Sequence, residues 1–422
     1  MTTVSLDAVR TALASACGDV TDATSADAVD GVPARLVARP GSTPETGELL
    51  RAAASFGLTV VARGRGTKMA WGRPPERVDL VVDMSRMSAV LDHAAGDLIV
   101  DTQAGALLSE VQQTVSSAGQ RLALDEPVPG SSIGGMLAVN GSGPGRVGVG
   151  TARDLLIGCT VVRADGVIAK AGGRVVKNVA GYDLGKLVIG SFGTLAVITE
   201  AVFRLHPVPP ARRWVTVPFA TAADAGRLVQ SVVHAQVVPS AVEVEWRSHG
   251  AGTVGVLLGG TAAGVESRTA TTLALLGDGA EAAEEPPPGW GVLPWREDAD
   301  RPGTGLKLTC ALSGLAPVLD AAHRAAADAG VTLTVRGSGG AGVLYGALPA
   351  DAPVAAVAAV VARTRAVCTE HGGALVVLES PAGVQAEVDT WGPVPAIDLM
   401  RRVKQQFDPE RRLAPGRFVG GI

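Results

Sequence analysis

Glycine is concentrated in three stretches of this chain, and each stretch adjoins an apolar run. They are VVARGRGTKMAWG (60–72), the segment 125–154, and GGRVVKNVAGYDLGKLVIGSFGTLAVITE (172–200). Glycine loses more backbone entropy on folding than any other residue, so it is costly inside a helix or strand. The three stretches therefore predict main chain against which something must lie closely, and they constrain the fold more than any other feature of the sequence.

The first stretch is a strand running into Arg-Gly-Arg-Gly-Thr (63–67). Successive backbone N–H groups without side-chain obstruction are suited to cradle a pyrophosphate. A plain turn between strand and loop is the alternative. Neither G-x-G-x-x-G opening a helix nor a phosphate loop ending in Gly-Lys-Ser/Thr is present, so any nucleotide contact must come from a different architecture.

The second stretch places hydroxyls and an amide among its glycines, at Ser131, Ser132 and Asn140. A disordered or purely structural loop is the alternative, but the embedded MLAVN (136–140) favours burial over disorder. In the third stretch, GSFGTL (190–195) forms a turn that feeds the strand-like AVITEAVF (196–203). Main chain at all three sites could approach one flat, phosphate-bearing ligand.

Composition excludes several classes of protein. A length of 422 residues allows two domains, and 47% hydrophobic with 18% charged residues indicates a globular chain. A net charge of −4 and 3% aromatic residues argue against a nucleic-acid partner. No segment has the length and apolarity of a membrane span, so no direct membrane insertion is expected, and the amino terminus does not resemble a signal peptide.

Four cysteines stand far apart, without a C-x-x-C or ferredoxin-type run; they are Cys17, Cys159, Cys310 and Cys368. This spacing argues against an iron–sulfur cluster or zinc knuckle held by this chain alone. Single scattered thiols fit a reducing compartment. The sequence therefore predicts a cytoplasmic protein, with peripheral membrane association through partner subunits as a further option.

Strands and helices alternate along most of the chain, and no internal repeat is evident in the sequence. TARDLLIGCTVVRADGVIAKAG (151–172) predicts a β-hairpin with Ala-Asp-Gly as its turn, and HPVPPARRW (206–214) predicts a linker. We expect four units: an N-terminal helix and lead-in at 1–30, a ligand-binding domain at 31–210, a second domain with βαβ-like alternation at 211–394, and a C-terminal segment at 395–422 that packs on the first domain.

These motifs carry a resemblance to a known family. PGSSIGG…AVNGSG…GTARDLLIG…ADG, followed by KNVAGYDLGKLVIGSFGTLAVITEAVFRLHP, resembles the FAD-binding domain of the vanillyl-alcohol oxidase/p-cresol methylhydroxylase (PCMH) superfamily. Within it, the likeness is greatest to FAD-binding subunits of bacterial glycolate oxidases. The C-terminal FDPERRLAPGRF resembles the family's closing FDP…NPGRF segment, with Ala414 in place of the usual Asn. The resemblance is strong over 33–210, weak over 211–390 and good over 395–422.

The resemblance implies an α+β fold: a two-lobed PCMH-type FAD-binding domain, an α/β cap domain, and a C-terminal helix that returns to the FAD domain. It also implies that the first loop wraps the FAD pyrophosphate, that the second stretch lines the cofactor from the other lobe, and that the third approaches its adenine-proximal half. The implied FAD contacts are Arg63, Gly64, Arg65, Gly66, Thr67, Pro129, Gly130, Ser131, Ser132, Ile133, Gly134, Gly135, Asn140, Gly143, Gly150, Gly193 and Ile198.

Departures from the family pattern matter as well. Some relatives bond the flavin covalently through a histidine in the first loop or a cysteine in the second stretch. This chain has neither residue there, so the expected cofactor is non-covalent, dissociable FAD. Phe192 stands where many catalytic relatives have Glu, and Ala196 replaces a common Gly.

The sequence motifs do not identify the catalytic groups. The catalytic relatives are similar to each other in a metal site of paired histidines and a glutamate, whereas the six histidines here are isolated, so no metal site is predicted. A cation near the flavin would stabilise its reduced anion or bind a substrate carboxylate. The candidates are Lys177 with Asn178 (the preferred pair), Lys307, Arg401 and Arg402, each with a solvated surface residue as the alternative.

The resulting hypothesis is an FAD-binding oxidoreductase, the FAD-binding subunit of a glycolate (2-hydroxy-acid) oxidase complex. Its implied partners are a catalytic flavoprotein subunit, an iron–sulfur subunit and a small 2-hydroxy acid. One alternative is a stand-alone flavin-dependent alcohol or hydroxy-acid dehydrogenase, and another is a non-catalytic FAD-binding scaffold. The exact substrate, the electron acceptor and the stoichiometry stay open.

Overall fold

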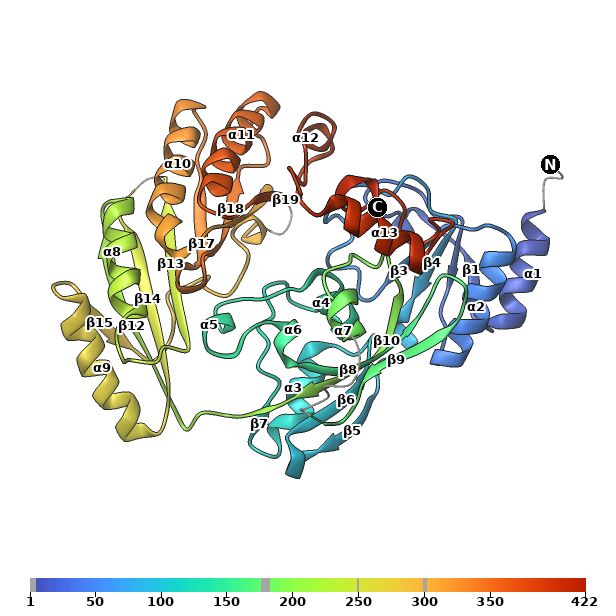
Figure 1. Ribbon diagram of the computed structural model, residues 1–422, viewed down its shortest axis with the longest axis horizontal. Coiled ribbons are helices and arrows are strands. Elements are labelled where there is room, and N and C mark those ends of the chain that lie inside the picture. Colours follow the sequence, from blue (N-terminus) through green and yellow to red (C-terminus); the bar gives the residue numbers. More distant parts are fainter. Residues whose placement is uncertain (1–4, 176–182, 249, 299–301) are drawn as a thin grey trace.

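The computed structural model describes residues 5–175, 183–248, 250–298 and 302–422. The chain forms two parts that meet along one face (Figure 1). The first part has two lobes, each built on its own sheet, and the second part is a single large sheet covered by helices. This arrangement confirms the α+β fold class with a two-lobed domain and a cap.

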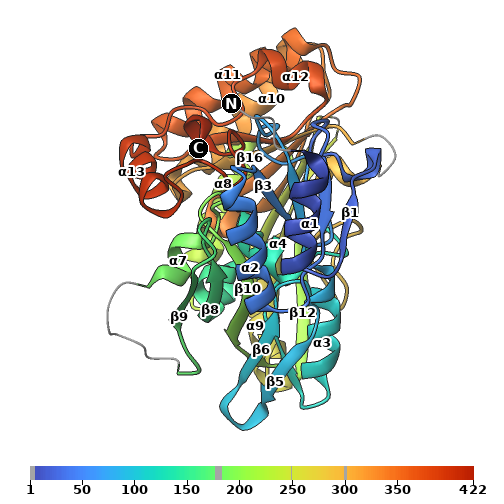
Figure 2. The same ribbon diagram turned by 90° about the vertical axis from the view of Figure 1, so that its right-hand side faces the viewer.

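The first lobe holds a four-stranded sheet in the order β1-β2-β4-β3, in which β2 and β3 run parallel to β4 and β1 runs antiparallel to β2. The strands β2 and β4 are buried over their whole length, because helices and the second lobe cover both faces. Helices α1 and α2 pack side by side on this lobe (Figure 2). The elements are α1 Leu6–Ala16, β1 Val20–Asp22, β2 Leu36–Ala38, α2 Thr43–Ser55, β3 Val60–Arg63 and β4 Leu80–Asp83.

Residues 5–22 belong to this lobe and are not a separate lead-in. Val9, Leu13 and Cys17 are buried in the core of the first lobe, and β1 pairs with β2. The sequence shows a helix followed by a polar stretch, and it carries no signal that this helix packs against α2. The domain-like unit at 1–30 is therefore the first helix and first strand of the lobe.

The second lobe holds a five-stranded sheet in the order β5-β6-β10-β8-β9, antiparallel throughout. The predicted hairpin is confirmed: β8 pairs with β9, and Gly166 at φ +77° completes the turn between them. The strands are β5 Val90–Ala94, β6 Ile99–Gln103, β8 Leu156–Val162, β9 Ile168–Gly172 and β10 Val197–Arg204, and a separate pair consists of β7 Gln120–Arg121 and β11 His206–Pro207. The helices are α3 Leu108–Ser116, α4 Ile133–Val139, α5 Arg146–Val149, α6 Ala152–Leu155 and α7 Leu184–Val188.

The cap is a structural duplication that the sequence does not reveal. Its eight-stranded antiparallel sheet has the order β15-β12-β14-β13-β17-β18-β16-β19, so each half is one βαββαβ unit and the halves join through β13 and β17. The first unit consists of β12 Ala211–Phe219, α8 Ala222–Val233, β13 Ala241–Arg247, β14 Gly252–Gly260, α9 Ala262–Leu276 and β15 Glu281–Ala283. The second consists of β16 Thr304–Thr309, α10 Leu315–Asp328, β17 Thr334–Ser338, β18 Val343–Leu348, α11 Val354–Glu370 and β19 Leu375–Glu379, followed by α12 Ala382–Glu387.

The predicted return of the C-terminal helix to the FAD domain is confirmed. After α13 (Ile397–Phe407), the chain lies beside β3, where Val60 N donates to Arg412 O and Ala414 N donates to Val60 O, both at 2.8 Å (Figure 1). Lys404 on α13 is buried and donates to Asp408 and to the carbonyls of Thr194 and Leu413. The FDP motif therefore fixes the tail to both lobes.

The cap and the two-lobed domain share a buried contact. Trp71, which follows the first glycine-rich loop, packs against Trp295 and Leu378 of the cap. The Glu379 carboxylate accepts hydrogen bonds from the indole N–H groups of Trp71 (3.2 Å) and Trp295 (2.8 Å), and from Arg296 at 2.9 Å through each of two nitrogens. This network holds the cap over one end of the glycine-rich loop.

Within the described part of the chain, no helix has the length and apolarity that crossing a membrane requires. The longest described helix, α11, has 17 residues, and a spanning helix needs about 20.

Candidate cofactor groove and substrate chamber

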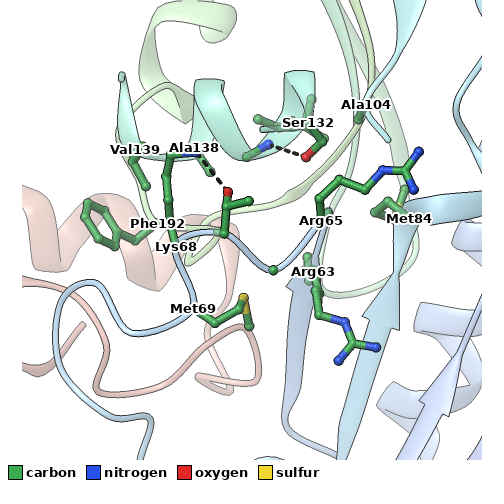
Figure 3. Close-up of a pocket in the computed structure, with 18 of the residues that line it drawn as sticks. Arg63, Arg65, Lys68, Met69, Met84, Ala104, Ser132, Ala138, Val139 and Phe192 are labelled. Carbon is green, nitrogen blue, oxygen red and sulfur yellow. Dashed lines mark hydrogen bonds between the residues drawn. The ribbon is translucent and has the colours of Figure 1, made fainter. Parts of the chain in front are cut away.

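A groove runs between the two lobes, and all three glycine-rich stretches contribute to its walls (Figure 3). The loop after β3 forms one wall, α4 of the second lobe forms the opposite wall, and the turn before β10 closes one side. The convergence predicted for these stretches is therefore present in the tertiary structure.

The five predicted residues of the first loop, Arg63 to Thr67, all line this groove. The Arg63 guanidinium, however, pairs with Asp83 at 2.8 Å and Asp27 at 2.9 Å, and in Figure 3 it points away from α4. Its charge is already balanced, so only its backbone is free for a ligand. Arg65 is exposed and makes no ion pair among the described residues.

Gly64 is required for the close approach of the two lobes. A Cβ at this position would lie 2.0 Å from Ser132 Oγ and 3.0 Å from Ser132 Cβ. Ser132 is the N-cap of α4, and its Oγ accepts a hydrogen bond from Gly135 N at 3.3 Å. The main chain of the loop at Gly64 is thus packed directly against the Ser132 side chain, which leaves no room for a larger residue at position 64.

The second stretch contributes a helix, which its glycine content does not suggest. Ser132 caps α4, and its apolar residues Ile133, Met136 and Leu137 are buried in the core of the second lobe. Tertiary burial outweighs the helix-breaking tendency of its two glycines. The residues of this stretch on the groove wall are Ser132, Gly134, Gly135, Ala138 and Val139.

The other predicted contacts of the second stretch lie elsewhere. Pro129 and Gly130 are exposed in the preceding turn, and Ile133 faces the core. Ser131 is fully buried behind the groove wall, where its Oγ accepts a hydrogen bond from Lys68 Nζ at 2.5 Å. None of these four residues lines the groove, and their predicted cofactor contacts stay predictions.

Asn140, Gly143 and Gly150 also lie outside the groove. Asn140 lines the chamber described below, and Gly143 lines a smaller pocket behind that chamber. Gly150 lines none of these spaces; it ends α5 at φ +80°, and a Cβ there would meet the Asp154 side chain at 2.5 Å. Local backbone geometry accounts for this glycine, and its predicted cofactor contact stays a prediction.

The third stretch supplies Gly193 and Ile198 to the groove wall, together with Phe192 and Ala196, and the predicted cofactor contacts of Gly193 and Ile198 stay predictions. Phe192 and Gly193 have φ of +56° and +72°, which places two consecutive residues in the left-handed region. Such strain is rare outside glycine and is found where the surrounding structure fixes it. Here the Phe192 ring is held by Trp391 and Phe418, at centroid distances of 5.1 and 5.4 Å.

Sequence reasoning did not identify two cations on the groove. Lys68 directly follows the predicted loop and lies on the groove wall (Figure 3). Its Nζ donates to Thr67 Oγ1 and to Ser131 Oγ. Arg417 comes from the C-terminal PGRF motif, is 4% exposed and donates to the carbonyls of Met69 and Trp71. The motif resemblance pointed to this segment without pointing to the arginine. The other unpredicted lining residues are Ala62, Met69, Met84, Ala104, Ala138, Val139, Phe192 and Ala196.

Burial changes the acidity of both cations. It lowers the pKa of Lys68 to about 8, with the nearby Arg296 charge acting in the same direction. It lowers the pKa of Arg417 to about 10, against the opposing effect of Asp30. Arg417 Nε has no hydrogen-bond partner among the described residues. An anion in the groove would stabilise the charged form of both side chains.

The groove fits FAD. Its glycines leave backbone N–H groups unobstructed, and Arg65, Lys68 and Arg417 provide positive charge for a pyrophosphate. The unpartnered Arg417 Nε is a buried donor that a phosphate or flavin oxygen could satisfy. Apolar side chains, among them Met69, complete the wall for flat rings.

A chamber beneath the cap adjoins the groove, and we call it the substrate chamber. It has a volume of about 220 Å³, and Val139 and Phe192 line both spaces. Most of its walls are aromatic or aliphatic. The lining residues are Trp71, Pro127, Val139, Asn140, Gly141, Ser142, Gly190, Phe192, Leu293, Lys307, Tyr345, Val376, Leu378, Trp391 and Phe418.

Lys307 is the one cation among the described residues that line this chamber. It lies on β16 opposite Tyr345 of β18, and its side chain makes no hydrogen bond or ion pair with any described residue. Burial lowers its pKa to about 8, and the Arg146 charge adds to this effect. An unpaired ammonium in an apolar chamber is costly unless an anion occupies the chamber with it.

The structure thereby distinguishes among the cations that the sequence proposed. Lys307 faces the substrate chamber, whereas Arg401 and Arg402 are exposed on α13, where Arg401 pairs with Asp398. Lys177 and Asn178 lie outside the described residues, so the preferred pair from the sequence is not placed.

A search of the described residues finds no group of three or more His, Cys, Asp or Glu side chains that could hold a metal ion. The walls of the groove and the substrate chamber contain no described histidine or cysteine. The described residues of this site therefore include neither a set of metal ligands nor a side chain to which flavin is commonly bonded.

The two-lobed fold, the glycine-lined groove and the chamber beneath the cap define a flavoprotein with a PCMH-type FAD-binding domain. Residues 34–172 match the model of the FAD binding domain, and residues 311–418 match that of the C-terminal domain of FAD linked oxidases. The chain belongs to the FAD-linked oxidases, a family of FAD-dependent oxidoreductases.

Curated relatives include subunits of glycolate oxidases. The chain is 31% identical to glycolate oxidase subunit GlcD of Bacillus subtilis over 49% of its own length and 44% of the relative's. It is 34% identical to subunit GlcE of Escherichia coli over 39% and 47% of the respective lengths. A D-lactate dehydrogenase of Archaeoglobus fulgidus is 32% identical over 49% and 46%. The matched segments thus span less than half of these relatives.

Among solved structures, alkyldihydroxyacetonephosphate synthase has the same fold. It superposes with a TM-score of 0.71 over 94% of this chain and 82% of that chain, at 18% sequence identity. At this identity the likeness extends to the fold alone.

Proposed function

We propose that this chain is the FAD-binding subunit of a glycolate oxidase-like complex and that it takes part in oxidising a small 2-hydroxy acid. The observation that carries the proposal is the substrate chamber, which adjoins the FAD groove and has a single unpaired lysine in a largely apolar wall. The relation to glycolate oxidase subunits and D-lactate dehydrogenases supports the same substrate class.

The residues of this chain would bind and orient the reactants. Backbone of the Gly64–Thr67 loop, with Arg65, Lys68 and Arg417, would hold the FAD pyrophosphate. Bound FAD would supply the oxidant, taking two electrons and one hydrogen from the substrate carbon. Lys307 would pair with the substrate carboxylate, and the aromatic walls would exclude water from the reacting end.

Partners follow from the same reasoning. The described residues offer no cysteine cluster for iron–sulfur ligation, because each described cysteine is isolated and Cys17, Cys159 and Cys368 are buried. Electrons would therefore leave through an iron–sulfur subunit, with a second flavoprotein subunit completing the complex. Membrane association, if present, would come through these partners.

The direct test is reduction of the bound flavin. The purified, FAD-loaded chain is mixed anaerobically with glycolate or D-lactate, alone and with co-purified partner subunits, and flavin absorbance is followed. Bleaching that requires the partners supports the proposed subunit role. Rapid bleaching by the isolated chain with an artificial acceptor instead indicates a stand-alone dehydrogenase, and a protein that binds FAD but is never bleached indicates a scaffold.

Replacing Lys307 by methionine is expected to raise the Kd for a 2-hydroxy acid about 10- to 100-fold, since a charge-assisted contact is lost. The flavin reduction rate at saturating substrate should change much less. In the parent protein, binding of the acid should weaken as pH rises through about 8, because the unliganded amine then loses its proton. K170M, at an exposed lysine of β9, is the matched control. Unchanged affinity in K307M would exclude the carboxylate contact.

The flavin is expected to dissociate on acid precipitation, because the described walls of the groove and chamber contain no histidine or cysteine to bond it. The measurement is an absorbance scan of supernatant and pellet. Yellow colour in the supernatant is the expected result, and colour retained in the washed pellet would show a covalent link.

A further inference from the structure

A second, smaller space lies behind the substrate chamber, and we call it the inner pocket. Its volume, about 20 Å³, is enough for about one water molecule. Four residues, Pro127, Ser142, Leu293 and Tyr345, line both spaces, so they form the partition between them. The Tyr345 hydroxyl donates a hydrogen bond to Ser142 O at 3.2 Å within this partition.

The wall of the inner pocket carries a buried carboxyl group with one unpartnered oxygen. Glu243 on β13 is 3% exposed, and its Oε1 has no hydrogen-bond partner among the described residues. The facing Ser338 Oγ on β17 is equally buried and also unpaired. Ser338 lies directly opposite Glu243 in the β13–β17 pair, and its hydroxyl stabilises the ionised carboxylate. Buried polar atoms are rarely left without partners, so Glu243 Oε1 is the atom that a water in the inner pocket would satisfy.

Glu243 forms no ion pair with a described residue, although charges surround it. Arg336 is committed to Glu245 and Glu297, at 2.7 and 2.6 Å. Arg146 of α5 donates to Ser142 Oγ at 3.0 Å. The remaining titratable groups that act on Glu243 are the half-buried Asp125 of the first domain and Tyr345 of β18.

This environment sets the acidity of the carboxyl group. Burial, with the Asp125 charge acting in the same direction, raises the pKa of Glu243 to about 8, against the opposing effects of the Ser338 hydroxyl and of the Arg146 and Arg336 charges. A general base is most effective when its pKa lies near the working pH. Glu243 could therefore exchange a proton in the neutral to mildly alkaline range.

We propose that Glu243, through one water and Tyr345, receives the proton that a 2-hydroxy acid releases from its hydroxyl group during oxidation. This inference rests on the proposed function. The substrate carbon loses its hydrogen with two electrons to the cofactor, and its O–H bond breaks as the C=O bond forms. The proton passes to the Tyr345 oxygen. The Tyr345 hydroxyl hydrogen, which is donated to Ser142 O at 3.2 Å, turns to the inner-pocket water and passes to it, and that water protonates the Glu243 carboxylate. Glu243 acts through Tyr345 and does not touch the substrate.

The test compares E243Q and Y345F with the parent FAD-loaded protein, reconstituted with its partner subunits where reduction requires them. Rapid-mixing experiments measure flavin reduction by saturating glycolate or D-lactate between pH 6 and 10. The parent rate should rise with pH through about 8, as Glu243 ionises. E243Q should lose that rise and be at least about 100-fold slower at the high-pH plateau, and Y345F should be slowed similarly. The control is E281Q, at an exposed carboxylate of β15 in the cap that does not line the inner pocket.

A second readout does not depend on activity. Infrared titration of the flavin-free protein should show a carboxylic C=O band that disappears near pH 8 in the parent and is missing in E243Q. A parent-like pH profile in folded E243Q, or a Glu243 band that titrates near the ordinary glutamate value, would overturn the relay alone. If no 2-hydroxy acid reduces the flavin in any subunit combination, the proposed function fails, and the relay fails with it. If E243Q does not fold, Y345F and the parent titration decide the question.

Discussion

Gly64→Ala is expected to weaken FAD binding about 10- to 100-fold, because overpacking at this point costs about 1–3 kcal/mol. The added Cβ would lie 2.0 Å from Ser132 Oγ, so either the loop or the start of α4 must move. Both elements line the cofactor groove. The measurement is FAD titration into flavin-free protein, followed by fluorescence quenching.

A double-mutant cycle isolates the cause of this loss. Ser132→Ala removes the clashing oxygen, so G64A/S132A should bind FAD more tightly than G64A alone. G96A is the matched glycine control, since a Cβ at Gly96 has no atom within 4 Å. Equal affinities for G64A and G96A would show that the close approach of the lobes is not required for binding.

Asp408→Ala is expected to lower the free energy of unfolding by about 3–5 kcal/mol, because it leaves a buried ammonium without its counter-ion. Asp408 is completely buried, accepts a hydrogen bond from Lys404 Nζ at 2.7 Å, and also accepts from the backbone N–H groups of Arg412 and Leu413. The same loss frees the tail that carries Arg417 to the groove, so FAD affinity should fall as well. Urea unfolding with and without FAD measures both effects.

The control for this substitution is on the same helix. Asp398 pairs with Arg401 in an exposed i,i+3 contact, and D398A should have little effect on stability. If D408A unfolds at the same urea concentration as D398A, the buried pair is not what fixes the tail, and the structural reading of the FDP motif is wrong.

The pH dependence expected for substrate affinity and that expected for the reduction rate have opposite signs, so the two can be measured separately. Substrate affinity should fall as pH rises through about 8, since Lys307 loses its charge. The rate at saturating substrate should rise over the same range, since Glu243 gains its charge. A measurement of kcat/KM alone would combine the two and could show almost no pH dependence.

The sequence by itself determined the cofactor domain. Glycine is costly inside a helix or strand, so its concentration in a few stretches indicates close approach of the main chain. Three such stretches with intervening strands predicted one groove. Gly64, Gly193 and Ser132 line that groove as expected. This succeeded because the constraint is local: a missing Cβ and a free N–H group are properties of the residue type itself.

Only the tertiary structure decided the other features. Arg63 is neutralised by Asp27 and Asp83, which no spacing in the sequence pairs with it. Arg417 reaches the groove from the far end of the chain. Lys307 and Glu243 lie on different cap strands and line two neighbouring spaces. Charge, burial and acidity depend on which groups are brought within a few ångströms, and contacts between residues so distant in sequence are set by packing, not by residue type.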